Sequence, residues 1–316
     1  MPCHTIVHRQ DWFLEENYRA RTDREEPGFL DRSFELHFNE RPFLNHFSYL
    51  FITRTTKERM RQQSNFSVLC RGHILPREVR DKDGILRFLE AVEQFGRIIC
   101  DSGLVRLERL TTEEITGKGK EAGLVEKYFS LSQEDTTTLE DIRLGGAEMR
   151  VGDKRLSVHT LSDADDLPSA VRTDGRYEKY STDRSDCRLS FAAPVGLMLP
   201  YNHICNQYVF IDDPSETLRH FEKAARNMRS LSRYSRANEI NRQWTEEYLN
   251  EAHSFGLVPV RCHCNVMVWS EDRERLRNIR NDTGSALAQM GCKPRHNTVD
   301  APTLYWAGIP GGEGDF

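Results

Sequence analysis

Hydrophobic residues in the first part of the chain recur with spacings that predict strands near the start and helices further on. Residues 5–12 predict a short strand. Residues 34–38 and 46–53 predict two neighbouring antiparallel strands, and the second of these runs is rich in aromatic and β-branched residues. The segment 83–101 predicts the clearest helix, since its apolar residues recur every three or four positions. A second helical segment is expected within 112–131, interrupted by a turn.

The middle of the chain alternates between apolar and polar positions, which is the period of a strand. Residues 149–161 predict a strand, a turn at Gly152 and Asp153, and a second strand. Residues 189–199 and 207–211 predict two further strands, joined by a short polar turn.

The last third of the chain contains the most regular helical pattern. Asp213 followed by Pro214 is typical of a helix start, with an acidic N-cap and a proline in the first turn. Neither glycine nor proline occurs from Ser215 to Ser254, and two apolar stripes with helical spacing predict two helices. The polar run 232–238 should separate them, because about 40 uninterrupted residues would make an unusually long helix.

Beyond this helical pair, strands and helices alternate to the end of the chain. We expect a strand over 257–269, a helix over 271–290, and short strands over 294–299 and 303–307. The order strand–helix–strand–helix–strand predicts a split βαβ-type, ferredoxin-like unit.

These elements together predict an α+β protein with mixed or antiparallel sheets and covering helices. We expect an N-terminal α+β subdomain over residues 1–145 and a C-terminal α+β subdomain, with the helical pair, over 146–310. The glycine-rich segment 311–316 is typical of the start of a linker.

Composition restricts the classes of function. The 316 residues carry a net charge of −5, with a pI of about 6.2, which argues against a strongly basic nucleic-acid-binding protein. Eight cysteines in a long chain without a signal peptide indicate reduced thiols and a cytoplasmic protein. No apolar run approaches the roughly 20 residues that span a bilayer.

Several common catalytic motifs are missing from the sequence. The phosphate-binding pattern G-x-x-x-x-G-K-[ST] does not occur, and the turn Gly117–Lys120 lacks the Ser or Thr and the upstream glycine that it requires. A G-x-S-x-G nucleophile motif and an H-E-x-x-H zinc motif are also missing. We therefore expect no catalytic residues and no cofactor; the alternative is a degenerate enzyme with an unrecognised cysteine site.

Cys262, His263 and Cys264 are the nearest approach to a metal-binding motif. On a strand, alternation directs the two cysteines to one face and the histidine to the other. A zinc site needs four converging ligands, and no second cysteine pair of the CxxC type is present. We interpret both thiols as core residues and expect no metal site.

Basic residues form the strongest candidate for a contact surface. Arg226, Arg229, Arg233 and Arg236 recur at three- and four-residue spacing, which on one helix gives a positive ridge. Such a ridge could contact nucleic-acid phosphates or an acidic partner; the alternative is a solvated helix face. Tyr234 is the only interleaved aromatic residue, which weakens the nucleic-acid interpretation.

Several long segments resemble the TraG proteins of conjugative transposons, a branch of the type IV secretion ATPases. These segments are HFNERPFLNHFSYLFITRTTKERMRQQSNF (37–66), EVRDKDGILRFLEAVEQFGRII (78–99), LSDADDLPSAVRTD (161–174), the segment 230–270 and MGCKPRHNTVDAPTLYWAGIPG (290–311). In that family a comparable region precedes a P-loop ATPase core, which binds ATP and Mg²⁺ and has no counterpart before Phe316 here.

The resemblance implies a non-catalytic N-terminal region that docks and assembles a conjugation ATPase during DNA transfer. Its implied partners are other conjugation proteins at the inner membrane, its own ATPase core and further copies of itself. The implied location is cytoplasmic, with a peripheral position at the inner membrane as an alternative. A hypothesis from another class is a nucleic-acid-binding adaptor that uses the arginine ridge.

Overall fold

An antiparallel sheet forms the centre of the structure. The structure is a computed structural model, and it describes residues 3–19, 26–40, 43–56, 81–103, 105–133, 140–144, 148–161, 163–168, 193–232 and 234–313. The strands are β1 (Cys3–Glu15), β2 (Leu44–Thr56), β3 (Ile142–Leu144), β4 (Met149–Val151), β5 (Lys154–Leu161), β6 (His203–Ile211), β7 (Val260–Ser270) and β8 (Arg295–Asn297). Their order is β2-β1-β6-β7-β5-β4-β3, and β8 also pairs with β5.

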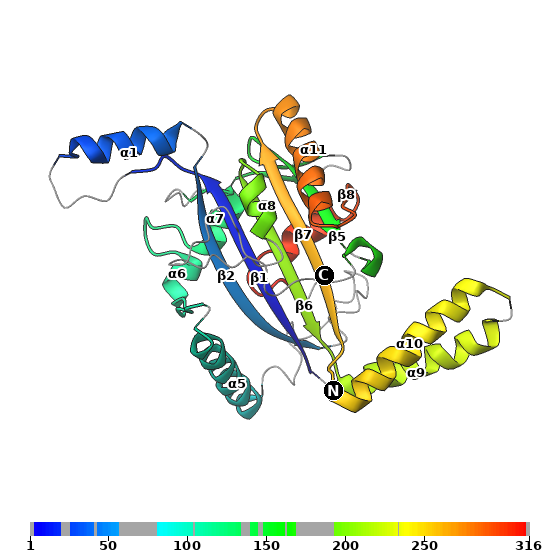
Figure 1. Cartoon of the computed structure of the whole chain (residues 1–316). Helices are drawn as coiled ribbons and strands as arrows, with labels where there is room; N and C mark the ends of the chain where they lie inside the picture. The colour runs from blue at the N-terminus through cyan, green and yellow to red at the C-terminus, as the bar shows by residue number, and fades with distance from the viewer. Residues whose placement is uncertain are drawn as a thin grey trace.

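Helices cover the sheet and extend beyond it (Figure 1). They are α1 (Phe29–Asn39), α5 (Lys82–Asp101), α6 (Thr112–Thr116), α7 (Leu124–Ser130), α8 (Ala193–Met198), α9 (Pro214–Leu231), α10 (Arg236–Phe255), α11 (Arg273–Gln289) and α12 (Ala301–Ala307), with a 3₁₀ turn at Ala164–Asp166. Within the described residues, no helix has both the length and the apolar character needed to cross a membrane.

Successive side chains of each strand point to opposite faces of the sheet, and apolar side chains lie on both faces. On one face, Trp12 belongs to a core cluster with Tyr128 of α7 and Leu304 of α12. On the other face, Val268 belongs to a cluster with Leu276 of α11, together with residues of α8. Thus α7 and α12 cover one face of the sheet, and α8 and α11 cover the other.

A buried layer of hydrogen bonds ties the segment after α12 to the sheet. Gln10 Nε2 donates to Asn206 Oδ1 at 2.8 Å and to the carbonyl oxygen of Gly308 at 2.9 Å. The His8 ring lies 3.0 Å from Asn206 Oδ1 through Nε2 and 3.3 Å from Glu313 Oε1 through Nδ1. Buried polar groups are costly unless they are hydrogen-bonded, so these contacts fix this segment against β1 and β6.

The α+β class is confirmed by this arrangement of helices and antiparallel strands. The predicted helix 83–101, the strand pair around Gly152 and the helical pair correspond to α5, β4–β5 and α9–α10. The last third differs from a split βαβ unit in one respect. Strands β6 and β7 are direct antiparallel neighbours, whereas the two strands of a split βαβ unit are parallel and separated by another strand.

Three segments expected as strands are helical where they are described. Residues 34–38 lie in α1, 193–198 form α8, and 303–307 lie in α12. Short apolar runs fit a helix or a strand equally well, and local contacts decide between them. At the start of α1, Asp31 accepts a hydrogen bond from the Gly28 amide at 2.8 Å, and Pro302 lies in the first turn of α12.

The two expected subdomains share one sheet in the described part of the chain. His8 of β1 pairs with Tyr208 of β6, and Arg143 of β3 pairs with Arg150 of β4 across the predicted boundary at residue 145. The division into two folding units stays a prediction. Of the expected linker 311–316, residues 314–316 lie outside the described residues.

We predict that Gly123→Ala destabilises the protein. A Cβ atom at Gly123 would collide with the amide nitrogen of Gly117 and the carbonyl carbon of Thr116, because the turn after α6 contacts the start of α7. Such overpacking should lower the free energy of unfolding by about 1–3 kcal/mol, measured by urea denaturation.

The matched control is Gly96→Ala in α5, where an added Cβ has no neighbour within 4 Å. Replacing a mid-helix glycine by alanine should raise the free energy of unfolding by about 0.5–1 kcal/mol. Equal effects of the two substitutions would contradict the close contact between α6 and α7.

Candidate interaction surface on the α9–α10 hairpin

The connection between β6 and β7 is a helical hairpin that projects from the end of the sheet (Figure 1). Ile211, the last residue of β6, pairs with Val260, the first residue of β7, so the intervening chain must leave and return at one place. Asp213 caps α9 by accepting hydrogen bonds from the amides of Ser215 and Glu216 at 2.9 and 3.2 Å. Gly256, with φ of 64°, ends α10 in the left-handed conformation.

The two helices pack against each other in their inner part. The rings of Phe221 and Tyr248 lie 5.4 Å apart in an edge-to-face arrangement, and Leu249 and Ala252 are buried. By contrast, none of the described residues from Arg226 to Tyr248 is buried. The outer half of the hairpin is therefore held by its inner half and by helix geometry.

Apolar residues are exposed on this outer half. Trp244 is 65% exposed and Tyr234 is 85% exposed, and Leu231 and Ile240 are exposed as well. The second of the two apolar stripes predicted between Ser215 and Ser254 consists of Ile240, Trp244, Tyr248 and Ala252, and it is covered at its inner end only. Sequence periodicity identified the stripe but could not show that its outer end lacks a cover.

The predicted arginine residues lie around the same end of the hairpin. Arg226 and Arg229 are in α9 and Arg236 is the first residue of α10, so the expected single-helix ridge is divided by the end of α9 at Leu231. Arg233 lies outside the described residues. The other three are exposed, and none has an ion-pair partner among the described residues.

Arg242 behaves differently from these three residues. Its guanidinium group lies 2.6 Å from carboxylate oxygens of both Glu239 and Glu246, so its charge is compensated within α10. We define the outer hairpin surface as the exposed arginines that have no ion-pair partner among the described residues, together with the exposed apolar and aromatic residues of the same half. These residues are Arg226, Arg229, Leu231, Tyr234, Arg236, Ile240 and Trp244.

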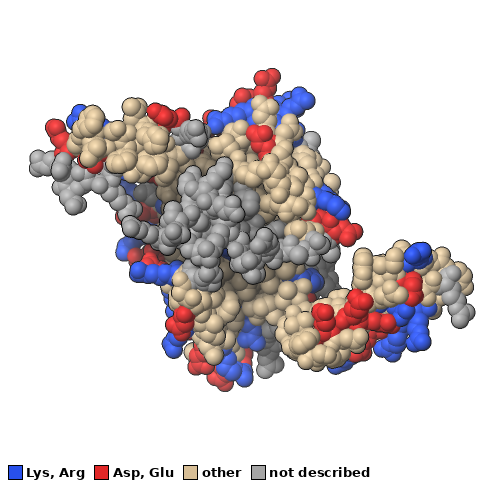
Figure 2. Space-filling view, viewed as in Figure 1, with Lys and Arg blue, Asp and Glu red and all other residues tan. Residues whose placement is uncertain are grey.

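The charge of the hairpin is balanced. Helices α9 and α10 together contain six basic and six acidic residues. Figure 2 shows Lys and Arg side chains near the outer end of the hairpin, with Asp and Glu side chains closer to the sheet. Binding of nucleic-acid phosphates needs a concentrated positive surface, whereas Trp, Tyr and Arg residues are enriched at protein–protein contacts.

The cysteines of the predicted Cys262–Cys264 motif differ in their surroundings. Cys264 lies against the core cluster under α11, and burial together with the neighbouring Cys262 and Cys292 raises its pKa to about 12. Cys262 is exposed, so the expected core role is wrong for this residue. His263 points to the other face, as alternation predicts.

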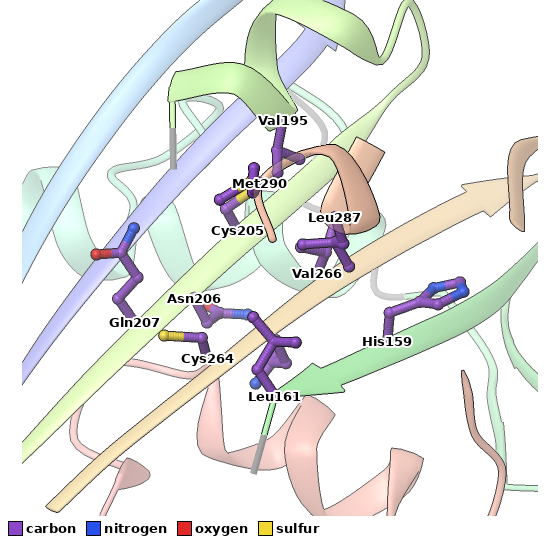
Figure 3. A pocket seen from close by; sticks show the side chains of 11 residues that line it. His159, Leu161, Val195, Cys205, Asn206, Gln207, Cys264, Val266, Leu287 and Met290 are labelled. Carbon is purple, nitrogen blue, oxygen red and sulfur yellow. The ribbon is translucent and has the colours of Figure 1, made fainter. Parts of the chain in front are cut away.

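A small pocket beside Cys264 has a mostly apolar lining (Figure 3). Cys205, Val195 and Met290 contribute to it, from β6, from α8 and from the end of α11. A thiolate is disfavoured in these surroundings, and burial raises the pKa of Cys205 as well. Among the described residues, no three His, Cys, Asp or Glu side chains are placed to hold a metal ion.

The turn Gly117–Lys120 is an ordered surface turn. Gly117 and Gly119 have positive φ angles of 87° and 64°, and the Lys118 ammonium lies 2.8 Å from Glu113. In the acidic segment 163–166, Asp166 is buried and accepts a hydrogen bond from Arg295 at 3.1 Å. This ion pair was not predictable from spacing, because 129 positions separate the two residues.

Comparison with models of known protein families gave no match, and no curated protein is significantly similar in sequence. The resemblance to TraG proteins therefore stays a prediction.

We predict that His263→Gln makes stability less dependent on pH. Burial lowers the pKa of His263 from 6.5 to about 4, so the folded protein keeps this ring neutral. Between these values the unfolded chain takes up a proton that the folded chain does not, and the free energy of unfolding falls as the pH falls, by about 1.4 kcal/mol per pH unit.

The variant should lose this contribution, measured as the slope of unfolding free energy between pH 4.5 and 6. His159 and His203, whose pKa values are also lowered to about 4, keep their own contributions of the same sign. An unchanged slope would show that His263 is not a buried neutral residue.

Proposed function

We propose that this chain is a non-catalytic docking and assembly region of a TraG-type conjugation ATPase, and that the outer hairpin surface binds another protein of the DNA-transfer machinery. The exposure of Trp244, on the same outer half of the hairpin as Arg226, Arg229 and Arg236, is the observation that carries this proposal. Among the described residues, these three arginines have no ion-pair partner. Burial of such aromatic and arginine side chains supplies most of the binding energy in many protein interfaces.

Two other helices support a role in assembly. Helix α1 has no buried residue, although Phe29, Leu30 and Leu36 are among its side chains. In α5, Gly84 is the one buried residue, so every side chain of the apolar stripe that predicted the helix is exposed or only partly buried. Amphipathic helices with uncovered apolar faces are typical of surfaces that bind other proteins.

The partner surface should match the chemistry of the outer hairpin surface. Trp244 and Tyr234 would fill an apolar groove, and Arg226, Arg229 and Arg236 would face carboxylates at its rim. We propose no hydrolysis of ATP by this chain, because the phosphate-binding motif is missing from its sequence. In a TraG-type protein that chemistry would belong to the ATPase core.

The second candidate function is a nucleic-acid-binding adaptor. The exposure of Trp244 favours it, since this residue adds to Tyr234 a second exposed aromatic ring that could stack on a base. The balanced charge of the hairpin opposes it.

We predict that a photo-crosslinking amino acid at position 244 captures a protein of the same DNA-transfer machinery in the cells that encode this chain. The matched control is position 255, because Phe255 is also exposed and lies at the inner end of the same helix. Mass spectrometry identifies the captured protein. Equal capture from both positions, or capture of nucleic acid alone from position 244, would contradict the proposal.

Salt dependence separates the two candidate functions. A nucleic-acid adaptor should bind single- or double-stranded DNA with an affinity that falls with salt, and Arg226→Gln with Arg229→Gln should reduce the slope of log K against log salt by about 2. The docking proposal expects no such binding at low ionic strength, measured by fluorescence anisotropy.

A further inference from the structure

A second candidate site lies where β4 and β8 pair with the same edge of β5. Leu156 of β5 pairs with Met149 of β4, and Val158 pairs with Asn297 of β8. Ser157 lies between these two pairs, so the edge is interrupted at this residue. The first half of α11 lies beside this interruption.

The interruption opens into a pocket of about 450 Å³. Its lining includes Ser157, Arg273, Arg277, Arg280, His296 and Asn297. Pockets that bind small molecules commonly have volumes of about 300–1,000 Å³. The size is therefore sufficient for a small ligand, and the lining determines which kind.

Three arginines of α11 give this pocket a positive charge. Arg273, Arg277 and Arg280 are spaced by four and three residues, which places them on one side of the helix. Among the described residues, no carboxylate lies within ion-pair distance of any of the three guanidinium groups. On the same helix, Arg275 does not line the pocket and lies 3.7 Å from Glu15.

Acidic residues do not cancel this charge. Glu148 lines the pocket, but its carboxylate lies 2.6 Å from Arg155 and 3.2 Å from Arg150, so it is compensated. Glu274 also lines the pocket and is exposed. Three arginines and one uncompensated carboxylate leave a net positive charge of about two, which favours an anion.

Ser157 provides an independent indication of a ligand. Its side chain is 4% exposed and lines the pocket, and its hydroxyl has no hydrogen-bond partner among the described residues. Most buried hydroxyl groups in folded proteins are hydrogen-bonded, so such a group requires an explanation. The hydroxyl is buried in this structure, and a change of its χ1 rotamer would allow it to donate to an oxygen of an anion in the pocket.

The strand β8 holds further donors in place. Arg295 lies 2.7 Å from Asp163 and 3.0 Å from Asp166, which fixes β8 beside β5. Asn297 Oδ1 accepts hydrogen bonds from the amides of Val299 and Asp300 at 3.1 and 2.9 Å, which leaves the Asn297 NH₂ group as a donor. Burial and the nearby Arg280 lower the pKa of His296, so its ring is neutral at pH 7 and can donate one hydrogen bond.

We propose that this pocket binds a small phosphorylated ligand with at least two phosphate groups. Arg273 and Arg280 are separated by about 10 Å along the helix axis, which suits more than one phosphate group. Guanidinium groups bind phosphate oxygens in a bidentate manner, and the Ser157 hydroxyl and Asn297 amide supply neutral donors. The proposal does not depend on the docking function, since the pocket and the hairpin share no residues.

Isothermal titration calorimetry of the full chain with inorganic pyrophosphate tests this proposal. Arg277→Gln and Arg280→Gln should each raise the Kd by about tenfold or more, because each removes a charged hydrogen bond. Ser157→Ala should raise it by a smaller factor. Arg275→Gln is the matched control on the same helix and should leave the Kd unchanged.

Three results would overturn the proposal: no binding of pyrophosphate at millimolar concentration, equal weakening by Arg275→Gln, or orthophosphate binding as tightly as pyrophosphate. Circular dichroism of each variant confirms that the fold is retained. ADP serves as a further ligand. Tighter binding of ADP than of pyrophosphate would identify a nucleotide, and equal binding would identify the phosphate groups as the recognised part, both in agreement with the proposal.

Discussion

The direct antiparallel pairing of β6 with β7 is the constraint on which the position of the outer hairpin surface depends. Because Ile211 and Val260 are paired, the chain between them has to start and finish at adjacent points of the sheet. A pair of antiparallel helices satisfies this requirement without covering the sheet. The hairpin thereby presents Trp244 and the arginines of its outer half away from the core (Figure 1).

Core clusters cover both faces of the sheet, whereas the helices that extend from it keep exposed apolar residues. Asn206 lies at the centre of the buried polar layer, since it accepts hydrogen bonds from Gln10 and donates to Asn265 at 2.9 Å. Such a layer specifies how β1, β6 and β7 align, because a shift of one residue would leave these groups unpaired. Helices α1 and α5 and the hairpin extend from this sheet (Figure 1), and each of them keeps exposed apolar residues.

Much of the fold could be predicted from local sequence signals, and the hairpin is the clearest case. Asp213 and Pro214 begin α9, Gly256 ends α10, and the residues between them contain no helix breaker. The segments 34–38 and 303–307 were wrongly expected as strands, because short aromatic runs carry no period that excludes a helix.

The two sites could be predicted only in part, because each depends on contacts between distant residues. The arginines of the outer hairpin surface were identified by their spacing, but the exposure of Trp244 depends on how far α9 and α10 cover each other. The pocket beside Ser157 and the α11 arginines was not predicted from the sequence. It requires β8 to pair with β5, and this pairing is supported by Asp166 and Arg295, which no local pattern connects.

The most direct test of the docking function is the frequency of conjugative DNA transfer from cells that carry Tyr234→Ala and Trp244→Ala together, with Phe255→Ala as the control. Loss of two central aromatic side chains typically weakens a protein interface by about 2 kcal/mol or more, so transfer should fall by about tenfold or more while the control transfers normally. Both variants should be present at the wild-type level, measured by immunoblotting. Unchanged transfer by the double variant at that level would contradict the account.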